Sequence, residues 1–317
     1  MITARPTIDA IASDAAPVAR FLDAERAFFE HSGVTVRSTF VELSRPRLRI
    51  RLLEAGAGEP TLLLHGGGGA AGLFAPLMAS LPAARLVAPD RPGHGLSDAF
   101  TYRGVDLRRH AVDFVGSIAE SLGGRPVRIV ANSMGALWAL WYALEHPERV
   151  SRLVLVGCPA LLLGTSGPLG FRLLSVRRLN EVMFGMEPAS PKQIQTLLRR
   201  MGHDPDRISE EFMTYMQRVE ELPAYRAAWL SLLETSLTAR GARKPFALGD
   251  AELRRVVQPT LFLWGANDPF GTTDVGRLAC SLMPDARLEV VGVGHLPWLD
   301  DAVRCGRLAS EFLAASV

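Results

Sequence analysis

Residues 127–150, VRIVANSMGALWALWYALEHPERV, decide the fold of this 317-residue chain. The run that starts at Val127 is largely apolar and rich in β-branched residues, which predicts a strand. Trp138, Trp141 and Leu144 then continue at helical spacing. Few residues separate the two patterns, so the chain must turn sharply from strand to helix at Ser133. A strand that leads directly into a helix is typical of a parallel α/β arrangement.

Similar apolar runs recur along the rest of the chain. They are TLLLHG, RLVAPD, VRIVAN, RLVLVG, TLFLWG and RLEVVG, with helical stretches between them. Runs without polar alternation are typical of strands buried on both faces, and intervening helices indicate right-handed parallel crossovers. Two earlier segments, 34–43 and 48–54, are separated by a short turn and predict an antiparallel entry. We therefore predict an α/β fold with a mostly parallel central sheet flanked by helices.

The alternation stops within residues 158–249, where the sequence is helical throughout. Helix starts are predicted at Ser190, at Ser209 and after Pro223, the last in a run that ends at Gly241. An insertion between two strands is most simply a helical cap over the carboxyl edge of the sheet, which leaves 34–157 and 250–317 as the core.

An N-terminal helical arm, residues 1–33, precedes the core. Its apolar residues predict an amphipathic helix over 17–32 that ends at Gly33. We expect this helix to pack on the main body, and a contact in a homo-oligomer is the alternative.

Composition excludes several classes of protein. The chain is 48% hydrophobic and 21% charged, with a net charge of +2 and no concentrated Lys/Arg run, so we expect neither a nucleic acid nor a membrane as partner. The three cysteines are too far apart for a disulfide framework or a metal site. The first twenty residues lack the apolar core of a secretory signal. We expect a cytoplasmic protein without a metal or an organic cofactor.

Polar residues follow three of the predicted strands. Ser133 follows the third run, Asp268 follows TLFLWG, and His295 follows RLEVVG. Because parallel strands end at one edge of a sheet, these side chains should converge there. A serine hydroxyl becomes a nucleophile when a base takes its proton and a third group orients that base. The plainer alternatives are a helix cap at Ser133, a surface histidine at His295 and Asp274 in place of Asp268.

The elbow and three other segments resemble the α/β-hydrolase superfamily over roughly residues 34–315. ANSMG resembles the nucleophile elbow G-x-S-x-G, with Ala131 in the place of the first glycine, and Ser, Asp and His follow in that family's order. The segments DRPGHGLSD (90–98), WGANDPF and GVGHLPW resemble other family motifs. The resemblance implies an oxyanion hole formed by the N–H group of Met134 and that of Gly67 or Gly68.

The glycine-rich loop also has a competing interpretation. Gly67, Gly69 and Gly72 have the spacing G-x-G-x-x-G of a dinucleotide-binding turn. That interpretation leaves Ser133, Asp268 and His295 without a common purpose, so we favour the oxyanion loop.

The substrate is less defined than the reaction. Asn132 and Met134 around the serine resemble the elbow of hydrolases that cleave meta-ring-fission products, but Leu296 follows His295 where those enzymes carry tryptophan. Candidate substrate contacts are Asn132, Phe184, Trp229 and Trp298. The sequence predicts a serine hydrolase that cleaves a small or medium, largely apolar carboxylic ester, a small-molecule substrate, through an acyl-enzyme. The alternatives are a carbon–carbon hydrolase and a non-catalytic protein that binds a small molecule.

Overall fold

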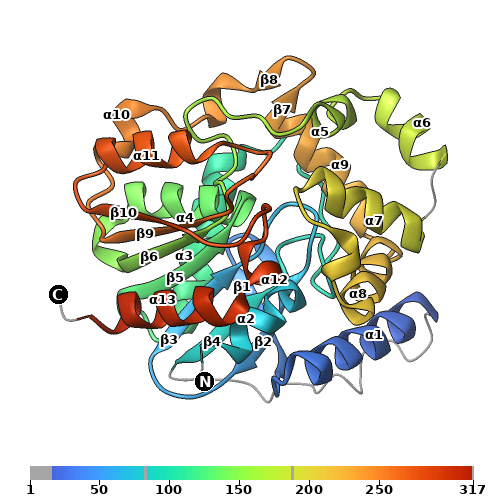
Figure 1. The fold of residues 1–317 in the computed structure, drawn as a ribbon, viewed down its shortest axis with the longest axis horizontal. Coiled ribbons are helices and arrows are strands. Elements are labelled where there is room, and N and C mark those ends of the chain that lie inside the picture. The colour runs from blue at the N-terminus through green and yellow to red at the C-terminus, as the bar shows by residue number, and fades with distance from the viewer. Residues whose placement is uncertain (1–15, 82–83, 187–188, 316–317) are drawn as a thin grey trace.

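An eight-stranded sheet forms the centre of the computed structural model, which describes residues 16–81, 84–186 and 189–315. The strands lie in the order β1-β2-β4-β3-β5-β6-β9-β10 (Figure 1). Their bounds are β1 Arg37–Ser44, β2 Arg47–Ala55, β3 Pro60–Leu64, β4 Arg85–Pro89, β5 Val127–Asn132, β6 Val150–Val156, β9 Thr260–Trp264 and β10 Ala286–Val290. All eight strands predicted from the sequence are therefore confirmed, and their observed ends lie within a few residues of the predicted ends.

Strand direction follows the predicted pattern. β2 pairs antiparallel with both β1 and β4, whereas β3, β4, β5, β6, β9 and β10 pair parallel with one another. The central strands are buried, as their apolar runs predict. β10 differs, because it is the edge strand and leaves Arg287 and Val290 exposed. The fold is thus the predicted α/β architecture, with a mostly parallel central sheet flanked by helices.

Helices cover both faces of the sheet. α2 and α13 pack together on one face, and α3 and α4 pack together on the other (Figure 1). The bounds of the helices around the sheet are α2 Ala75–Ala79, α3 Leu107–Ser121, α4 Met134–Glu145, α10 Asp250–Leu253, α11 Thr273–Leu282, α12 Pro297–Asp300 and α13 Ala302–Ala314. Because these helices cover the faces of the sheet, the residues at the carboxyl ends of the strands can face the inserted segment between β6 and β9.

The inserted segment is helical, with one difference from the sequence prediction. Its helices are α5 Leu169–Leu174, α6 Leu179–Met186, α7 Pro191–Arg200, α8 Glu210–Glu220 and α9 Tyr225–Ser236. The hydroxyls of Ser190 and Ser209 accept hydrogen bonds from backbone N–H groups and cap α7 and α8, as predicted. The run predicted to be helical up to Gly241 instead ends at Ser236. A small hairpin follows, with β7 Leu237–Thr238 and β8 Gly241–Ala242, and φ at Gly241 is +141°, a conformation that glycine adopts readily.

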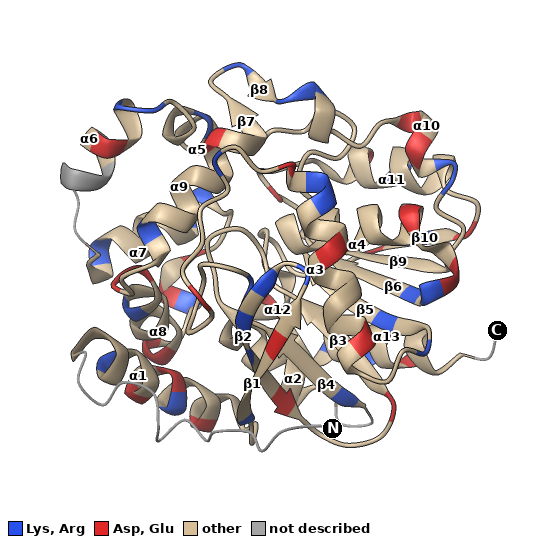
Figure 2. Cartoon of the chain, turned by 180° about the vertical axis from the view of Figure 1, so that it is seen from behind, with Lys and Arg blue, Asp and Glu red and all other residues tan. Residues whose placement is uncertain are grey.

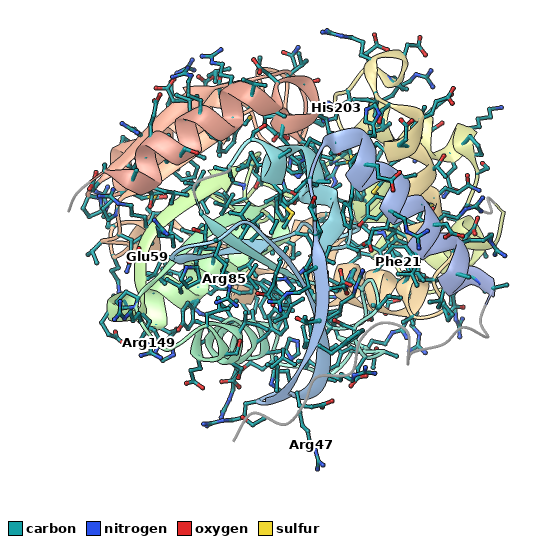
Figure 3. All side chains as sticks on the ribbon, turned by 90° about the horizontal axis from the view of Figure 1, so that it is seen from below. Phe21, Arg47, Glu59, Arg85, Arg149 and His203 are labelled. Carbon is teal, nitrogen blue, oxygen red and sulfur yellow. The ribbon has the colours of Figure 1, made fainter. Side chains whose placement is uncertain are left out.

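The predicted N-terminal helix is α1, Ala16–Ser32, and it packs mainly on α8 of the insertion. Phe21, which points toward the body of the molecule in Figure 3, and Phe28 both contact the ring of Tyr215. Glu25 forms a buried ion pair with Arg51 of β2, with 3.0 Å between Oε1 and Nη1. α1 therefore joins the insertion to the sheet. The first fifteen residues of the predicted arm lie outside the described residues.

Charged residues of both signs are interspersed along the elements seen from behind (Figure 2), in keeping with a net charge of +2. Arg47, at the tip of the hairpin between β1 and β2, protrudes from the molecule (Figure 3). Of the helices in the described residues, none has the length and apolarity needed to cross a membrane.

Candidate active site

The turn from β5 into α4 holds Ser133 in an unusual backbone conformation. Its φ of 52° and ψ of −113° lie outside the regions that residues with a side chain normally adopt. Such a conformation costs about 1–3 kcal/mol and persists only where the surroundings impose it. Gly135 is one such constraint, because a Cβ there would lie 2.1 Å from the carbonyl oxygen of Leu64. The sequence places small residues around Ser133 because helix and strand approach this closely.

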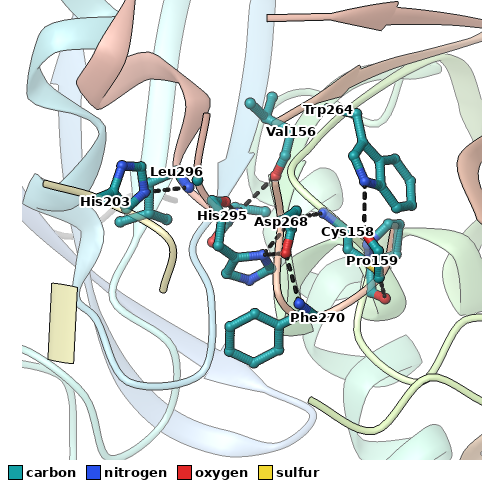
Figure 4. Close-up of polar contacts among 12 residues, drawn as sticks. Val156, Cys158, Pro159, His203, Trp264, Asp268, Phe270, His295 and Leu296 are labelled. Atoms are coloured by element: carbon teal, nitrogen blue, oxygen red, sulfur yellow. Dashed lines mark hydrogen bonds and ion pairs between the residues drawn. The ribbon is translucent and has the colours of Figure 1, made fainter. Parts of the chain in front are cut away.

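Asp268 lies in the loop after β9 and is fully engaged by hydrogen-bond donors. Its Oδ2 accepts the N–H of Cys158 at 2.8 Å, and its Oδ1 accepts the N–H of Phe270 at 2.8 Å (Figure 4). The Nδ1 of His295 lies 2.8 Å from Oδ2 and 3.0 Å from Oδ1. The carboxylate is buried and its two backbone donors fix its orientation. The structure therefore brings Asp268 and His295 together, as the sequence predicts.

The imidazole of His295 is held on both sides. Phe270 stacks on its ring, with 4.0 Å between centroids and 25° between planes. When Nδ1–H of His295 donates its hydrogen bond to the carboxylate of Asp268, the neutral form of the ring carries no proton on Nε2. This Nε2 is buried and has no hydrogen-bond partner among the described residues. Both His295 and Ser133 line the same pocket, so Nε2 is available as a proton acceptor there.

Asp274, the alternative acid in the sequence, lies elsewhere. It is exposed in the first turn of α11, and its carboxylate pairs with Arg277 at 2.5 Å. The surroundings of Asp268 and Asp274, rather than their positions in the sequence, therefore show which carboxylate contacts the histidine. The geometry assigns the histidine partner to Asp268.

A histidine of the insertion, His203, holds the loop that carries His295. Its Nε2 accepts the N–H of Leu296 at 3.0 Å, and its Nδ1 lies 3.3 Å from Oδ1 of Asp300 (Figure 4). Burial raises the pKa of Asp300, but the hydrogen bonds from His203 and two backbone N–H groups lower the pKa below its ordinary value overall. Sequence reasoning missed His203, because nothing in its own segment indicates a contact with a loop some ninety residues later.

Arg91 fixes the glycine-rich loop after β3 through hydrogen bonds to its backbone. Nη2 of Arg91 donates to the carbonyl oxygens of Gly66 at 2.6 Å and Gly67 at 3.1 Å. A trans peptide directs its N–H opposite to its C=O, so the N–H groups of Gly67 and Gly68 point away from the guanidinium. Met134 begins α4, and the first N–H groups of a helix have no partner within the helix. All three residues line the pocket, so their N–H groups are available to an anion there.

Two buried histidines belong to the frame of this loop. His65 bonds to the carbonyl oxygen of Gly66 and to the N–H of Arg91, and burial lowers its pKa well below the ordinary range. Burial lowers the pKa of His94 to about 3. Asp90 accepts the N–H groups of Ala71 and Leu96 and so braces the same region. The three side chains are structural supports.

The four predicted substrate contacts have different positions. Trp229 of α9 lines the pocket, where a Cβ on Gly67 would lie 2.4 Å from its ring. Asn132 also lines the pocket, but its amide donates to the carbonyl oxygen of Val156 at 2.7 Å. Trp298 is buried outside the pocket lining, and its Nε1–H donates to the carbonyl oxygen of Leu73 at 3.1 Å. Phe184 belongs to α6, and its side chain lies outside the described part of the structure.

The remaining pocket lining is largely apolar and comes mostly from the insertion. Two residues that the sequence did not single out as contacts are Tyr225, which donates to the carbonyl oxygen of Gly68 at 3.3 Å, and Glu220. Within the described residues, no three His, Cys, Asp or Glu side chains group together as a metal site would require. The arrangement can thus deliver a hydroxyl, a proton acceptor and anion-binding N–H groups to one apolar pocket.

Comparison with known proteins gives concordant results. Residues 61–307 match the model of the alpha/beta hydrolase family. A 2-hydroxy-6-oxononadienedioate/2-hydroxy-6-oxononatrienedioate hydrolase of Burkholderia vietnamiensis is 31% identical over 273 residues, which cover 84% of this chain and 91% of that protein.

Solved structures give the same fold. Carboxylesterase CesB from Bacillus subtilis has a TM-score of 0.75 at 18% identity, over 96% of this chain and all of that one. The 2-hydroxy-6-oxo-6-phenylhexa-2,4-dienoate hydrolase from a Rhodococcus strain has a TM-score of 0.72 at 23% identity, over 89% of this chain and all of that one. At these identities the structural matches support the fold alone.

Proposed function

This chain belongs to the alpha/beta hydrolase family, and from that premise we propose that it hydrolyses a largely apolar carboxylic ester through an acyl-enzyme. One observation carries the proposal: the Asp268–His295 pair leaves Nε2 unpartnered in a pocket that Ser133 also lines. A base oriented in this way is what a serine hydroxyl requires to become a nucleophile.

In the proposed reaction, Oγ of Ser133 attacks the carbonyl carbon while Nε2 of His295 takes the hydroxyl proton. Asp268 stabilises the resulting imidazolium and keeps Nδ1 protonated. The carbonyl oxygen becomes an oxyanion, which the N–H groups of Met134 and of Gly67 or Gly68 stabilise. Collapse of the intermediate breaks the bond to the alkoxy oxygen, and His295 gives that oxygen the proton.

Water then attacks the acyl-enzyme by the same route. His295 takes a proton from the water, and the acid leaves when the bond to Oγ breaks and Oγ recovers a proton. The backbone strain at Ser133 supports this assignment, since strained conformations gather at sites where a side chain must be presented.

Carbon–carbon bond hydrolysis is the second candidate, and the relative in Burkholderia vietnamiensis favours it by its name. Asn132 and Met134 also flank the serine as in the elbow of such enzymes. Against it, Leu296 follows His295, and the amide of Asn132 is engaged with the backbone of β6. The apolar lining of the pocket supports an ester rather than a dicarboxylate.

One experiment compares the two reactions. Aryl esters of short and medium acids and a 2-hydroxy-6-oxo-dienoate are assayed with the wild type and with Ser133→Ala. We expect kcat/KM for the best ester to exceed that for the dienoate by about 10² or more, with both rates lost in Ser133→Ala. Preference for the dienoate would replace the ester proposal by the second candidate. Saturable binding of these compounds without any product would favour the non-catalytic alternative.

A further inference from the structure

α8 turns one face toward the pocket, and that face ends in a carboxylate. Phe212, Met216 and Glu220 follow one another at four-residue steps, and all three line the pocket. Residues four apart lie one above the other on the same side of a helix. Glu220 therefore brings an acidic group into a pocket whose other residues from α8 are apolar.

No hydrogen bond or ion pair joins the side chain of Glu220 to another described residue, and its Oε2 is buried without a partner. Its neighbour Glu221, the C-cap residue directly after α8, provides a contrast. Glu221 pairs with Arg218 at 2.6 Å and accepts a hydrogen bond from Gln217 at 3.1 Å. Burial raises the pKa of Glu220 to about 7, whereas Arg218 and Gln217 bring the pKa of Glu221 below its ordinary value in spite of partial burial.

The other titratable side chains that line the described part of the pocket do not neutralise Glu220. They are Arg200, Tyr225 and His295. Tyr225 uses its hydroxyl proton for the carbonyl oxygen of Gly68, and burial together with the charge of Glu220 raises its pKa well above the ordinary value. Arg200 is exposed and forms no ion pair with Glu220, and His295 directs Nδ1 to Asp268.

A buried acceptor without a donor destabilises the free protein, and a ligand that supplies the donor recovers that loss. We propose that the substrate carries a hydrogen-bond donor, an alcohol hydroxyl or a protonated amine, which the carboxylate of Glu220 accepts. A carboxylate at the same position of the substrate is rejected, because two like charges would meet in an apolar pocket. This inference rests on the proposed ester hydrolysis for its reaction and adds the class of substrate.

The consequence for specificity is large. A site built to bond a substrate hydroxyl or amine discriminates strongly against an analogue without it, because the protein group is then left unpaired. Glu220 is thus a residue that determines specificity, while the reacting groups remain Ser133 and His295. The dicarboxylates in the name of the Burkholderia vietnamiensis relative would meet repulsion at this position.

The test uses two sets of aryl esters, one substituted on the acyl part and one on the alcohol part. Each set carries a methyl, a hydroxymethyl, an aminomethyl or a carboxyl group at the same position. For the set that reaches Glu220, the wild type should prefer hydroxymethyl and aminomethyl over methyl by about 10- to 100-fold in kcat/KM, with the carboxyl ester slowest. The aminomethyl preference should increase as the pH rises through 7, because Glu220 becomes ionised.

Glu220→Gln is the informative variant and Glu221→Gln the matched control, since both change one glutamate at the end of α8. Glu220→Gln should lose the aminomethyl preference and its pH dependence, keep part of the hydroxymethyl preference and accept the carboxyl ester better. Glu221→Gln should leave every ratio unchanged. Ratios in Glu220→Gln within about twofold of wild type, in a variant that still hydrolyses the methyl ester, would overturn the inference.

Failure of the reaction can be distinguished from failure of the subsite. If the wild type hydrolyses none of the esters, the same compounds are titrated by calorimetry into Ser133→Ala and into Ser133→Ala/Glu220→Gln. Affinity that depends on the hydroxymethyl or aminomethyl group and disappears with Glu220 upholds the subsite without the ester reaction. Affinity that is indifferent to the substituent overturns it.

Discussion

Replacement of Asp268 by asparagine tests the orientation of the histidine. In the wild type, the carboxylate of Asp268 accepts the N–H of Phe270 at Oδ1 and the N–H of Cys158 at Oδ2, each at 2.8 Å. An asparagine has one oxygen, so in either orientation its amide nitrogen faces one of these two donors. One buried N–H then loses its partner, and we expect the free energy of unfolding to fall by about 1–3 kcal/mol.

The effect on turnover should be larger than the effect on stability. Nδ1 of His295 lies 2.8 Å and 3.0 Å from the two carboxylate oxygens, so the amide nitrogen comes within reach of Nδ1 in both orientations. Where the amide nitrogen donates to Nδ1, the ring proton moves to Nε2, and Nε2 can no longer take the proton of Ser133. The loss in kcat/KM should be about 10³–10⁴, or about 4–5.5 kcal/mol of transition-state stabilisation.

The assay measures kcat/KM on the best aryl ester and stability by urea unfolding, with Asp274→Asn as the control. Asp274 is exposed and pairs only with Arg277 among the described residues, so its variant should keep wild-type activity. A folded Asp268→Asn that retains more than about a tenth of wild-type kcat/KM would show that Asp268 does not orient His295 for catalysis. An inactive Asp274→Asn would move the acid to that residue.

Three further variants have defined outcomes. Gly67→Ala places a Cβ 2.4 Å from the ring of Trp229, so the loop should shift and kcat should fall about 10²-fold. Addition of Trp229→Ala should restore part of the rate, and no recovery would contradict the clash. Trp298→Phe removes the bond to the carbonyl oxygen of Leu73 and should lower the free energy of unfolding by about 1 kcal/mol with KM unchanged, whereas a raised KM would put Trp298 in the binding site. In Glu220 the folded-state pKa of about 7 exceeds the ordinary 4.5, so the wild type loses stability as the pH rises between these values. Thermal unfolding should therefore find Glu220→Gln equal to the wild type at low pH and more stable by about 2 °C or more above pH 7, and a pH-independent difference would contradict this.

The core of the fold was predictable because its signals are local. Each central strand is an apolar run without alternation, and each is bounded by glycine, proline or a polar residue. The convergence of Ser133, Asp268 and His295 followed from one rule, that parallel strands end at the same edge. The structure agrees on Asp268 and His295 through a direct contact, and it places Ser133 in the same pocket.

The insertion was predictable only in outline. Capping residues marked the starts of α7 and α8, but Gly241 did not mark the end of α9, because α9 ends at Ser236 and Gly241 belongs to the hairpin that follows. Which helix face meets the core is a tertiary property, so His203 and Glu220 carried no signal that sets them apart from surface residues. Trp298 was expected near the substrate because it is close to His295 in sequence, yet the loop turns its indole toward Leu73.

The proposed reaction depends most directly on Ser133 as an activated nucleophile. The direct measurement is peptide mass spectrometry after exposure of the folded protein to serine-directed fluorophosphonates of several sizes, with Ser133→Ala as the control. We expect a single adduct on the peptide that contains Ser133, and no adduct in the control. An unlabelled Ser133 in folded protein with every probe, or equal labelling of the Ser133→Ala control, would contradict it.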